Sequence, residues 1–159
     1  TFGITTGTSN CGAGLIARCD SAIGSSEAKF GLTESRLGLL PAVISPYVIA
    51  AIGARQARRW FATAETFDAA EAQRIGLLHA VVPADALDAA VKRQVDLLLN
   101  AGPFAASHAK VLVRRISSED DRDKQDRDNA ELIARLRVSS EGQEGLAAFL
   151  EKRKPGWAP

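Results

Sequence analysis

The chain has 159 residues, of which 46% are hydrophobic and 25% are charged, and its formal net charge is +1. This composition is ordinary for a globular domain with a core, and the balanced charge gives no reason to expect nucleic acid or an anionic membrane as a partner. The two cysteines, Cys11 and Cys19, lack a metal-site spacing, so we expect free thiols in a reducing, cytoplasmic compartment. No apolar run is long enough to predict a membrane span.

The first third of the chain predicts short strands around a Gly-rich turn. Residues 1–10 have turn composition and predict a loop. Because the chain opens in this segment on Thr rather than Met, we expect that the N-terminal part of a longer protein is missing. The elements predicted next are a helix over 14–19, strands over 20–25 and 28–32, and a helical turn over 33–37 that Thr33 caps and Gly38 ends.

The rest of the chain predicts mainly helices. The apolar stretch 42–52 predicts a buried helix that starts or kinks at Pro46 and stops at Gly53. Asp68 and Glu71 have the spacing of a capping box. Further helices are predicted over 54–63, 68–76, 84–100, 103–116, 129–138 and 143–152, with a strand over 77–82 and a charged helix face or loop over 118–127. The pattern indicates the second half of an α/β domain followed by a helical tail.

Residues 10–14 and Glu34 are the candidate site. Glycines before a helix let a ligand approach backbone N–H groups, which suit a developing negative charge on oxygen. A carboxylate downstream could then transfer a proton beside a thioester carbonyl. On the pattern alone, a first-turn carboxylate at Glu34 and turn glycines at Gly12 and Gly14 are the more common explanation.

The other polar residues give weaker evidence of a function. His79 lies in an apolar strand and His108 in a helix of small residues, and neither predicts a metal site. Asp20 is expected to bond backbone at a turn. A nucleotide phosphate at the Gly turn is a weaker alternative, because the turn lacks a Gly-Lys-Ser/Thr ending and a Rossmann spacing.

Several motifs together resemble the enoyl-CoA hydratase/isomerase (crotonase) family. The matching residues are 12–15, 19–20, 26–34, 37–41, 67–72, 76–77 and 140–153. The resemblance implies an α/β fold, namely the C-terminal part of a ββα spiral with a helical tail and with its N-terminal turns missing. It divides the chain into an atypical loop or truncated end (1–11), a partial core (12–83) and an oligomerising helical region (84–159), which implies a homotrimer or hexamer.

The resemblance also implies roles for individual residues. The substrate would be an acyl-CoA thioester, with no separate cofactor because coenzyme A is part of the substrate. Backbone N–H groups at Cys11 and Gly12 would form the oxyanion hole, and Glu34 would be the catalytic acid/base. Two-carboxylate hydratases of the family carry a second Glu at the position of Gly14. Substrate-binding positions would be Gly14, Pro41 and Lys152.

Lys152 resembles a lysine that contacts the CoA phosphates of a neighbouring subunit, although an exposed basic residue is the simpler interpretation of residues 152–154. Residues 40–48 resemble the bacterial methylglutaconyl-CoA and isohexenylglutaconyl-CoA hydratases, so a hydratase is expected. The alternatives are an enoyl-CoA isomerase, which needs only one shuttle base, and an inactive oligomerising fragment of such an enzyme. Residues 4–10 do not fit the family pattern.

Overall fold

The computed structural model describes residues 1–9 and 12–159, and it divides into two compact units, residues 1–92 and 93–159. The division falls inside helix α4 (Leu87–Leu99), whereas the sequence places it between residues 83 and 84. Each unit is described by itself below.

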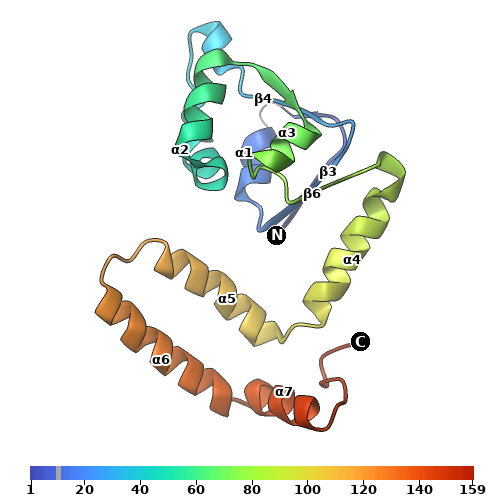
Figure 1. Cartoon of the computed structure of the whole chain (residues 1–159), viewed down its shortest axis with the longest axis vertical. Coiled ribbons are helices and arrows are strands. Elements are labelled where there is room, and N and C mark those ends of the chain that lie inside the picture. The colour runs from blue at the N-terminus through green and yellow to red at the C-terminus, as the bar shows by residue number, and fades with distance from the viewer. Residues whose placement is uncertain (10–11) are drawn as a thin grey trace. The chain divides into compact units, whose positions relative to one another are not determined.

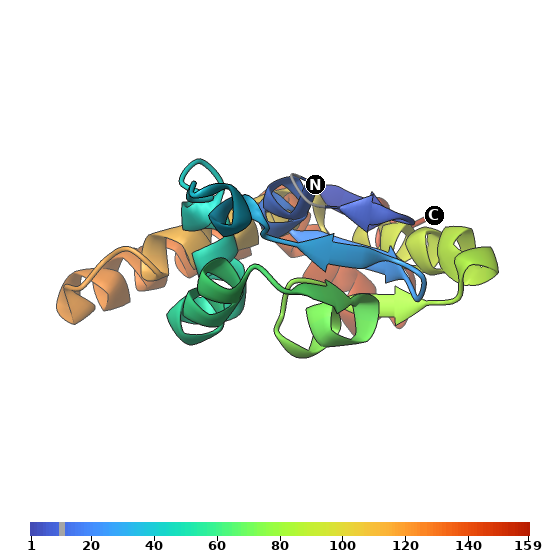
Figure 2. The same ribbon diagram turned by 90° about the horizontal axis from the view of Figure 1, so that it is seen from above.

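Two small sheets form the frame of the first unit. One has the order β1-β3-β6, with all its strands parallel, and its strands run side by side in Figure 2, with the yellow-green β6 at one edge. The other has the order β2-β4-β5, with β2 parallel and β5 antiparallel to β4. The strands are β1 (Phe2–Thr5), β2 (Thr8–Ser9), β3 (Ser21–Ser25), β4 (Lys29–Gly31), β5 (Thr66–Asp68) and β6 (Ala80–Val82).

The predicted loop over residues 1–10 is wrong for β1 and β2. Strand β1 pairs with β3 from Phe2↔Ser21 to Thr5↔Gly24, and β2 pairs with β4. The Gly- and Thr-rich composition favours a turn locally, but the backbone groups of these residues find ladder partners on strands that lie later in the chain. Local composition does not report such partners.

Helices complete the first unit (Figure 1), and an aromatic cluster lies in its core. The helical elements are α1 (Gly12–Arg18), η1 (Glu34–Leu37), α2 (Ser45–Thr63), α3 (Ala69–Arg74) and η2 (Ala84–Ala86). Phe67 of β5 stacks on Phe30 of β4 with ring centroids 5.7 Å apart, and Trp60 of α2 lies 4.5 Å from Phe67. The core of this unit therefore joins the second sheet to α2.

Helix α2 agrees with one of the two alternatives predicted at Pro46, a helix start. It begins at Ser45 with Pro46 in its first turn, where a missing N–H costs nothing, so Pro46 starts the helix rather than kinking it. Gly53 ends the first helical segment as predicted, because its φ of 77° and ψ of 155° are not helical, and a second segment continues to Thr63. A glycine tolerates that backbone conformation, so α2 is two helical segments joined at Gly53.

The helix caps agree only in part with those predicted from the sequence. Gly38 adopts the left-handed conformation and ends η1 as predicted, but Thr33 makes no side-chain cap. The Asp68 carboxylate accepts the Glu71 N–H at 2.8 Å, which confirms the N-cap of α3. Glu71 pairs with Arg74 at 2.6 Å, and this hydrogen bond lowers the pKa of the Glu71 carboxyl.

The second unit contains the end of α4, α5 (Pro103–Ile116), α6 (Arg122–Val138) and α7 (Ser140–Leu150). Helix α6 begins inside the charged run, with Asp121 accepting the Lys124 N–H at 3.0 Å. Of its described residues, only Gln125 and Ala148 are buried. Large apolar side chains are exposed on every helix of this unit, so it holds almost no core of its own.

None of the described helices combines the length and the apolar character that crossing a membrane requires.

The Asp68 cap gives a direct stability test. Replacing Asp68 with Ala leaves the Glu71 N–H at the start of α3 without its acceptor, so we expect the free energy of unfolding to fall by about 1 kcal/mol in urea titration. Asp68→Asn keeps an acceptor oxygen and should lose much less. Equal losses for the two variants would contradict the cap.

Candidate active site

Glu34 stands at the first position of η1, separated by two residues from the end of β4. Leu32, two residues before it, is 1% exposed and anchors the strand end in the core. The hydroxyl of Ser35, the next residue, donates a hydrogen bond to the carbonyl of Phe61 on α2. The Glu34 carbonyl accepts the Leu39 N–H at 3.1 Å. The backbone of Glu34 is thus fixed from both sides.

The Glu34 carboxylate is less well satisfied than its backbone. Its Oε2 atom is buried and has no hydrogen-bond partner among the described residues. A carboxylate that served only to stabilise the start of η1 would bond its N–H groups. A buried, unpartnered oxygen is instead unfavourable in the absence of a donor, and a site that a ligand completes is one explanation of such an atom.

Of the predicted oxyanion-hole pair, Cys11 lies outside the described residues and Gly12 begins α1. A Cβ placed on Gly12 would come 3.2 Å from the Oγ of Ser9, so backbone and side chain approach closely here. A hollow of about 310 Å³ lies between β1 and α1, and Gly12 and Ser9 both line it.

Gly14 and the segment that holds Pro41 come together. Gly14 is buried in α1, and a Cβ on it would lie 2.3 Å from the Cγ2 of Ile44. Pro41 is buried three residues before Ile44, and its carbonyl accepts the Ser45 N–H at 2.9 Å. Gly14 therefore lies against Ile44, and Pro41 lies in the segment that leads into the start of α2.

Helix α2 connects the two parts of the site. It packs against α1, which carries Gly12 and Gly14, and against η1, which carries Glu34. The guanidinium of Arg18 lies 5.5 Å from the centre of the Tyr47 ring and adds a cation–π contact between α1 and α2. In the part of the chain that the structure describes, no group of His, Cys, Asp and Glu side chains is arranged to hold a metal ion.

Lys152 belongs to the second unit, after the end of α7. It is exposed and has a left-handed backbone with φ 55°. The guanidinium of the next residue, Arg153, donates hydrogen bonds of 2.6 and 2.9 Å to the Glu144 carboxylate. The Gly156 N–H donates to the same carboxylate at 2.8 Å. The Arg153 hydrogen bond, followed by that of Gly156, lowers the pKa of Glu144 to about 2. The tail around Lys152 is therefore held to α7.

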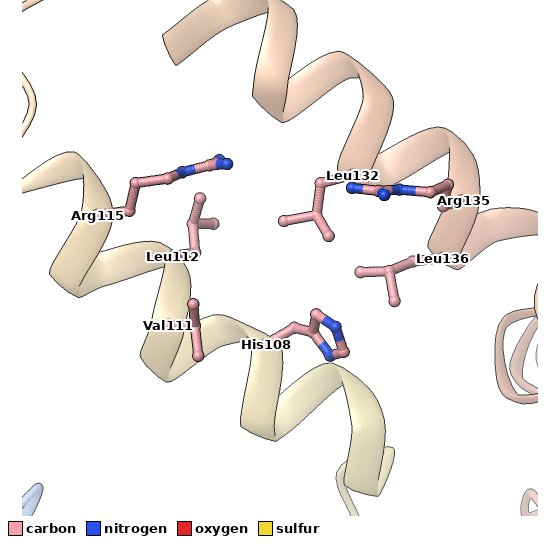
Figure 3. Close-up of a pocket in the computed structure, with 7 residues that line it drawn as sticks. All are labelled: His108, Val111, Leu112, Arg115, Leu132, Arg135 and Leu136. Carbon is pink, nitrogen blue, oxygen red and sulfur yellow. The ribbon is translucent and has the colours of Figure 1, made fainter.

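The two histidines have structural partners. The Nδ1 atom of His79 accepts the Ala22 N–H at 3.0 Å and extends the pairing of β3 toward β6. His108 lines a groove of about 420 Å³ between α5 and α6, in which leucines of both helices face one another (Figure 3), and its Nδ1 lies 2.8 Å from the Phe104 carbonyl. None of the predicted site residues lines this groove.

Comparison with known proteins shows the family of this chain. Residues 5–159 match the model of the enoyl-CoA hydratase/isomerase family. The chain belongs to this family. A Mycobacterium bovis protein named "Probable enoyl-CoA hydratase echA8" is 36% identical over 145 residues, which are 91% of this chain and 56% of that protein.

Solved structures agree. An enoyl-CoA hydratase/isomerase from Marinobacter aquaeolei superposes with a TM-score of 0.94 at 35% identity, over 99% of this chain and 60% of that one. An enoyl-CoA hydratase from Shewanella pealeana gives a TM-score of 0.89 at 44% identity, over 97% and 58%. The predicted α/β fold is thus confirmed. This chain spans little more than half the length of these relatives, and its match to the family begins at Thr5, earlier than the motifs from Gly12 onward indicate.

Two contacts around the site are not predicted from the sequence. One is the Ser35–Phe61 hydrogen bond, which joins residues 26 positions apart. The other is the approach of Ile44 to Gly14. A glycine inside a short apolar helix was the one available hint, because helix interiors disfavour glycine unless close packing requires it.

The tail near Lys152 gives a prediction of pH dependence. Because the pKa of Glu144 is lowered, the stability that its ion pair contributes is present above about pH 4.5 and is lost as the pH falls toward about 2. Glu144→Gln should release the tail already at pH 7. The Trp157 indole, whose N–H lies 3.4 Å from the Asn100 carbonyl, reports the release by NMR.

The matched control is Glu131→Gln, an exposed carboxylate on α6 for which no ion pair is described. Its Trp157 indole signal should remain that of the unaltered protein. An indole signal that stays in place in Glu144→Gln at pH 7 would contradict the role of this ion pair.

Proposed function

We propose that the protein containing this chain hydrates the double bond of 2-enoyl-CoA thioesters, with Glu34 as the proton-transfer residue. Family membership supports the class of reaction. The observation that carries the assignment of the residue is the buried Oε2 of Glu34, which no described group bonds. A bound water or a substrate carbon beside this oxygen would supply the missing proton.

The proposed reaction needs one base and one set of backbone donors. Glu34 takes a proton from water while the water oxygen attacks the β-carbon of the substrate. Electrons move to the thioester oxygen, which N–H groups at Cys11 and Gly12 stabilise as an oxyanion. The resulting enolate then takes the proton from Glu34 at its α-carbon, so the double bond gains the elements of water and Glu34 returns to its starting state.

The acyl group is proposed to be branched and of the methylglutaconyl type, because residues 40–48 resemble that branch. Exposed apolar side chains follow Glu34 closely in the chain and offer surface to such a group. They are Leu37, Leu39, Leu40 and Val43, each at least 60% exposed. Lys152 is proposed to contact the CoA phosphates, since its side chain is exposed and its neighbour Arg153 is already paired.

Isomerisation of a 3-enoyl-CoA is the second candidate. It is favoured by the presence of a glycine where two-carboxylate hydratases carry Glu, because moving a double bond needs a single base that removes a proton from one carbon and returns it to another. The two reactions are separated by their substrates. Hydration of a 2-enoyl-CoA consumes its conjugated double bond, whereas isomerisation of a 3-enoyl-CoA creates one.

Glu34→Gln tests the proposed reaction in the full-length gene product that contains this chain. The amide keeps the shape of the carboxylate but cannot accept the proton, so we expect kcat to fall by roughly 10²- to 10⁴-fold with crotonyl-CoA and methylglutaconyl-CoA. The affinity for coenzyme A and the unfolding midpoint should hardly change.

Glu27→Gln is the matched control, because Glu27 is exposed in the turn before β4. It should keep the kcat of the unaltered enzyme. Near-normal turnover by Glu34→Gln would exclude Glu34 as the acid/base. If neither the unaltered enzyme nor Glu34→Gln hydrates a 2-enoyl-CoA, and Glu34→Gln loses 3-enoyl-CoA isomerisation, the result would instead support the second candidate.

We propose further that the protein assembles as a homotrimer or a hexamer through its second unit. The apolar side chains that this unit exposes would be costly in a monomer. Phe149 and Leu150 at the end of α7 are 80% and 77% exposed, and Val138 before α7 is 76% exposed. Burial of these side chains against other copies of the chain would supply the core that the unit lacks.

Light scattering on the full-length protein tests this assembly. We expect the mass of three or six copies, and Phe149→Asp should shift the protein toward smaller species because it places a charge in the interface. Arg127→Asp, on the exposed charged face of α6, should leave the mass unchanged. A monomeric unaltered protein would contradict the proposal.

A further inference from the structure

Gly14 of α1 has no room for a side chain beside Ile44, the residue before α2. A Cβ on Gly14 would lie 2.3 Å from the Cγ2 and 2.7 Å from the Cβ of Ile44, both well inside van der Waals contact. Other glycines of the same unit have more room. A Cβ on Gly12 would meet its nearest atom at 3.2 Å, and one on Gly7 would meet nothing within 4 Å. The space in front of Gly14 is therefore filled by Ile44 in particular.

Ile44 cannot make room by turning its side chain. Its own Cβ accounts for the contact of 2.7 Å, and this atom does not move when the side chain changes rotamer. The side chain is also branched at that atom and packs against the core, so its rotamer is restricted. The carbonyl of Ile44 accepts the Val48 N–H at 3.0 Å in the first turn of α2. Moving Ile44 would therefore displace the start of that helix.

We infer that Ile44 closes position 14 to any side chain and thereby limits the site to a single carboxylate, Glu34. This inference rests on the proposed function for its catalytic meaning, since two-carboxylate hydratases carry their second Glu at position 14. Ile44 determines the number of carboxylates without taking part in the reaction. A carboxylate at position 14 requires a change at position 44 as well.

A series of unfolding midpoints tests, without an activity assay, whether Ile44 closes position 14. Gly14→Ala should lower the unfolding midpoint by roughly 5 °C, because overpacking is destabilising. Ile44→Ala keeps the Cβ that causes the contact of 2.7 Å, so it should relieve Gly14→Ala only in part. Ile44→Gly removes that atom, and in this background Gly14→Ala should cost nothing further. Ile44→Gly is itself expected to be less stable than the unaltered protein, so each comparison is made within its own background.

Gly7→Ala is the matched control, because nothing lies within 4 Å of its added Cβ. Its effect should be the same with Ile44 and with Ile44→Gly, as for independent sites. If Gly14→Ala were as stable as the unaltered protein, or if its effect were equal in both backgrounds, the closure by Ile44 would be overturned.

An activity series tests the catalytic consequence. Gly14→Glu alone should hydrate crotonyl-CoA poorly and unfold at a lower temperature. Gly14→Glu/Ile44→Gly should exceed it at least tenfold in kcat/KM. Equal activities of the two variants would overturn the link between Ile44 and the number of carboxylates. If the unaltered enzyme hydrates neither crotonyl-CoA nor methylglutaconyl-CoA, the proposed function fails, and the stability series still decides the closure.

Discussion

The packing of α2 against α1 and η1 is the constraint on which the first unit depends. Through Trp60, α2 joins the aromatic cluster of the second sheet, and through the Phe61 carbonyl it holds Ser35 beside Glu34. Just before its first residue, Ile44 lies against Gly14. Helix α2 and the residue before it therefore hold the turn that carries Glu34 and leave no room for a side chain at position 14. A change in α2 would affect both.

Glu34 shows how a rigid frame tolerates an unfavourable atom. A buried carboxylate oxygen without a partner costs free energy, and a flexible turn would rotate it toward water. Buried Leu32 and the Ser35 hydrogen bond prevent this, because they fix the chain on both sides of Glu34. The stability of the core thus maintains the Glu34 carboxylate in a position that it would not adopt by itself, as is common at functional sites.

The features that the sequence predicts well are those with local causes. The Asp68 cap, the left-handed Gly38 and the start of α5 at Pro103 each depend on residues within one or two turns. Strands β1 and β2 were missed because their hydrogen-bond partners lie later in the chain. The family motifs single out Glu34 and Gly14. The Ile44 contact depends on how two helices pack, which local composition and periodicity do not report.

The two units differ in what stabilises them, and this difference bears on the site. The first unit buries an aromatic and aliphatic core of its own, whereas the second buries only Gln125 and Ala148 among its described residues. Ion pairs such as Glu144–Arg153 fix its local geometry, but exposed pairs add little stability. If other copies of the chain supply the missing apolar contacts, as we propose, the proposed contact of Lys152 with coenzyme A would depend on the oligomer. The proposed chemistry at Glu34 would depend on the first unit.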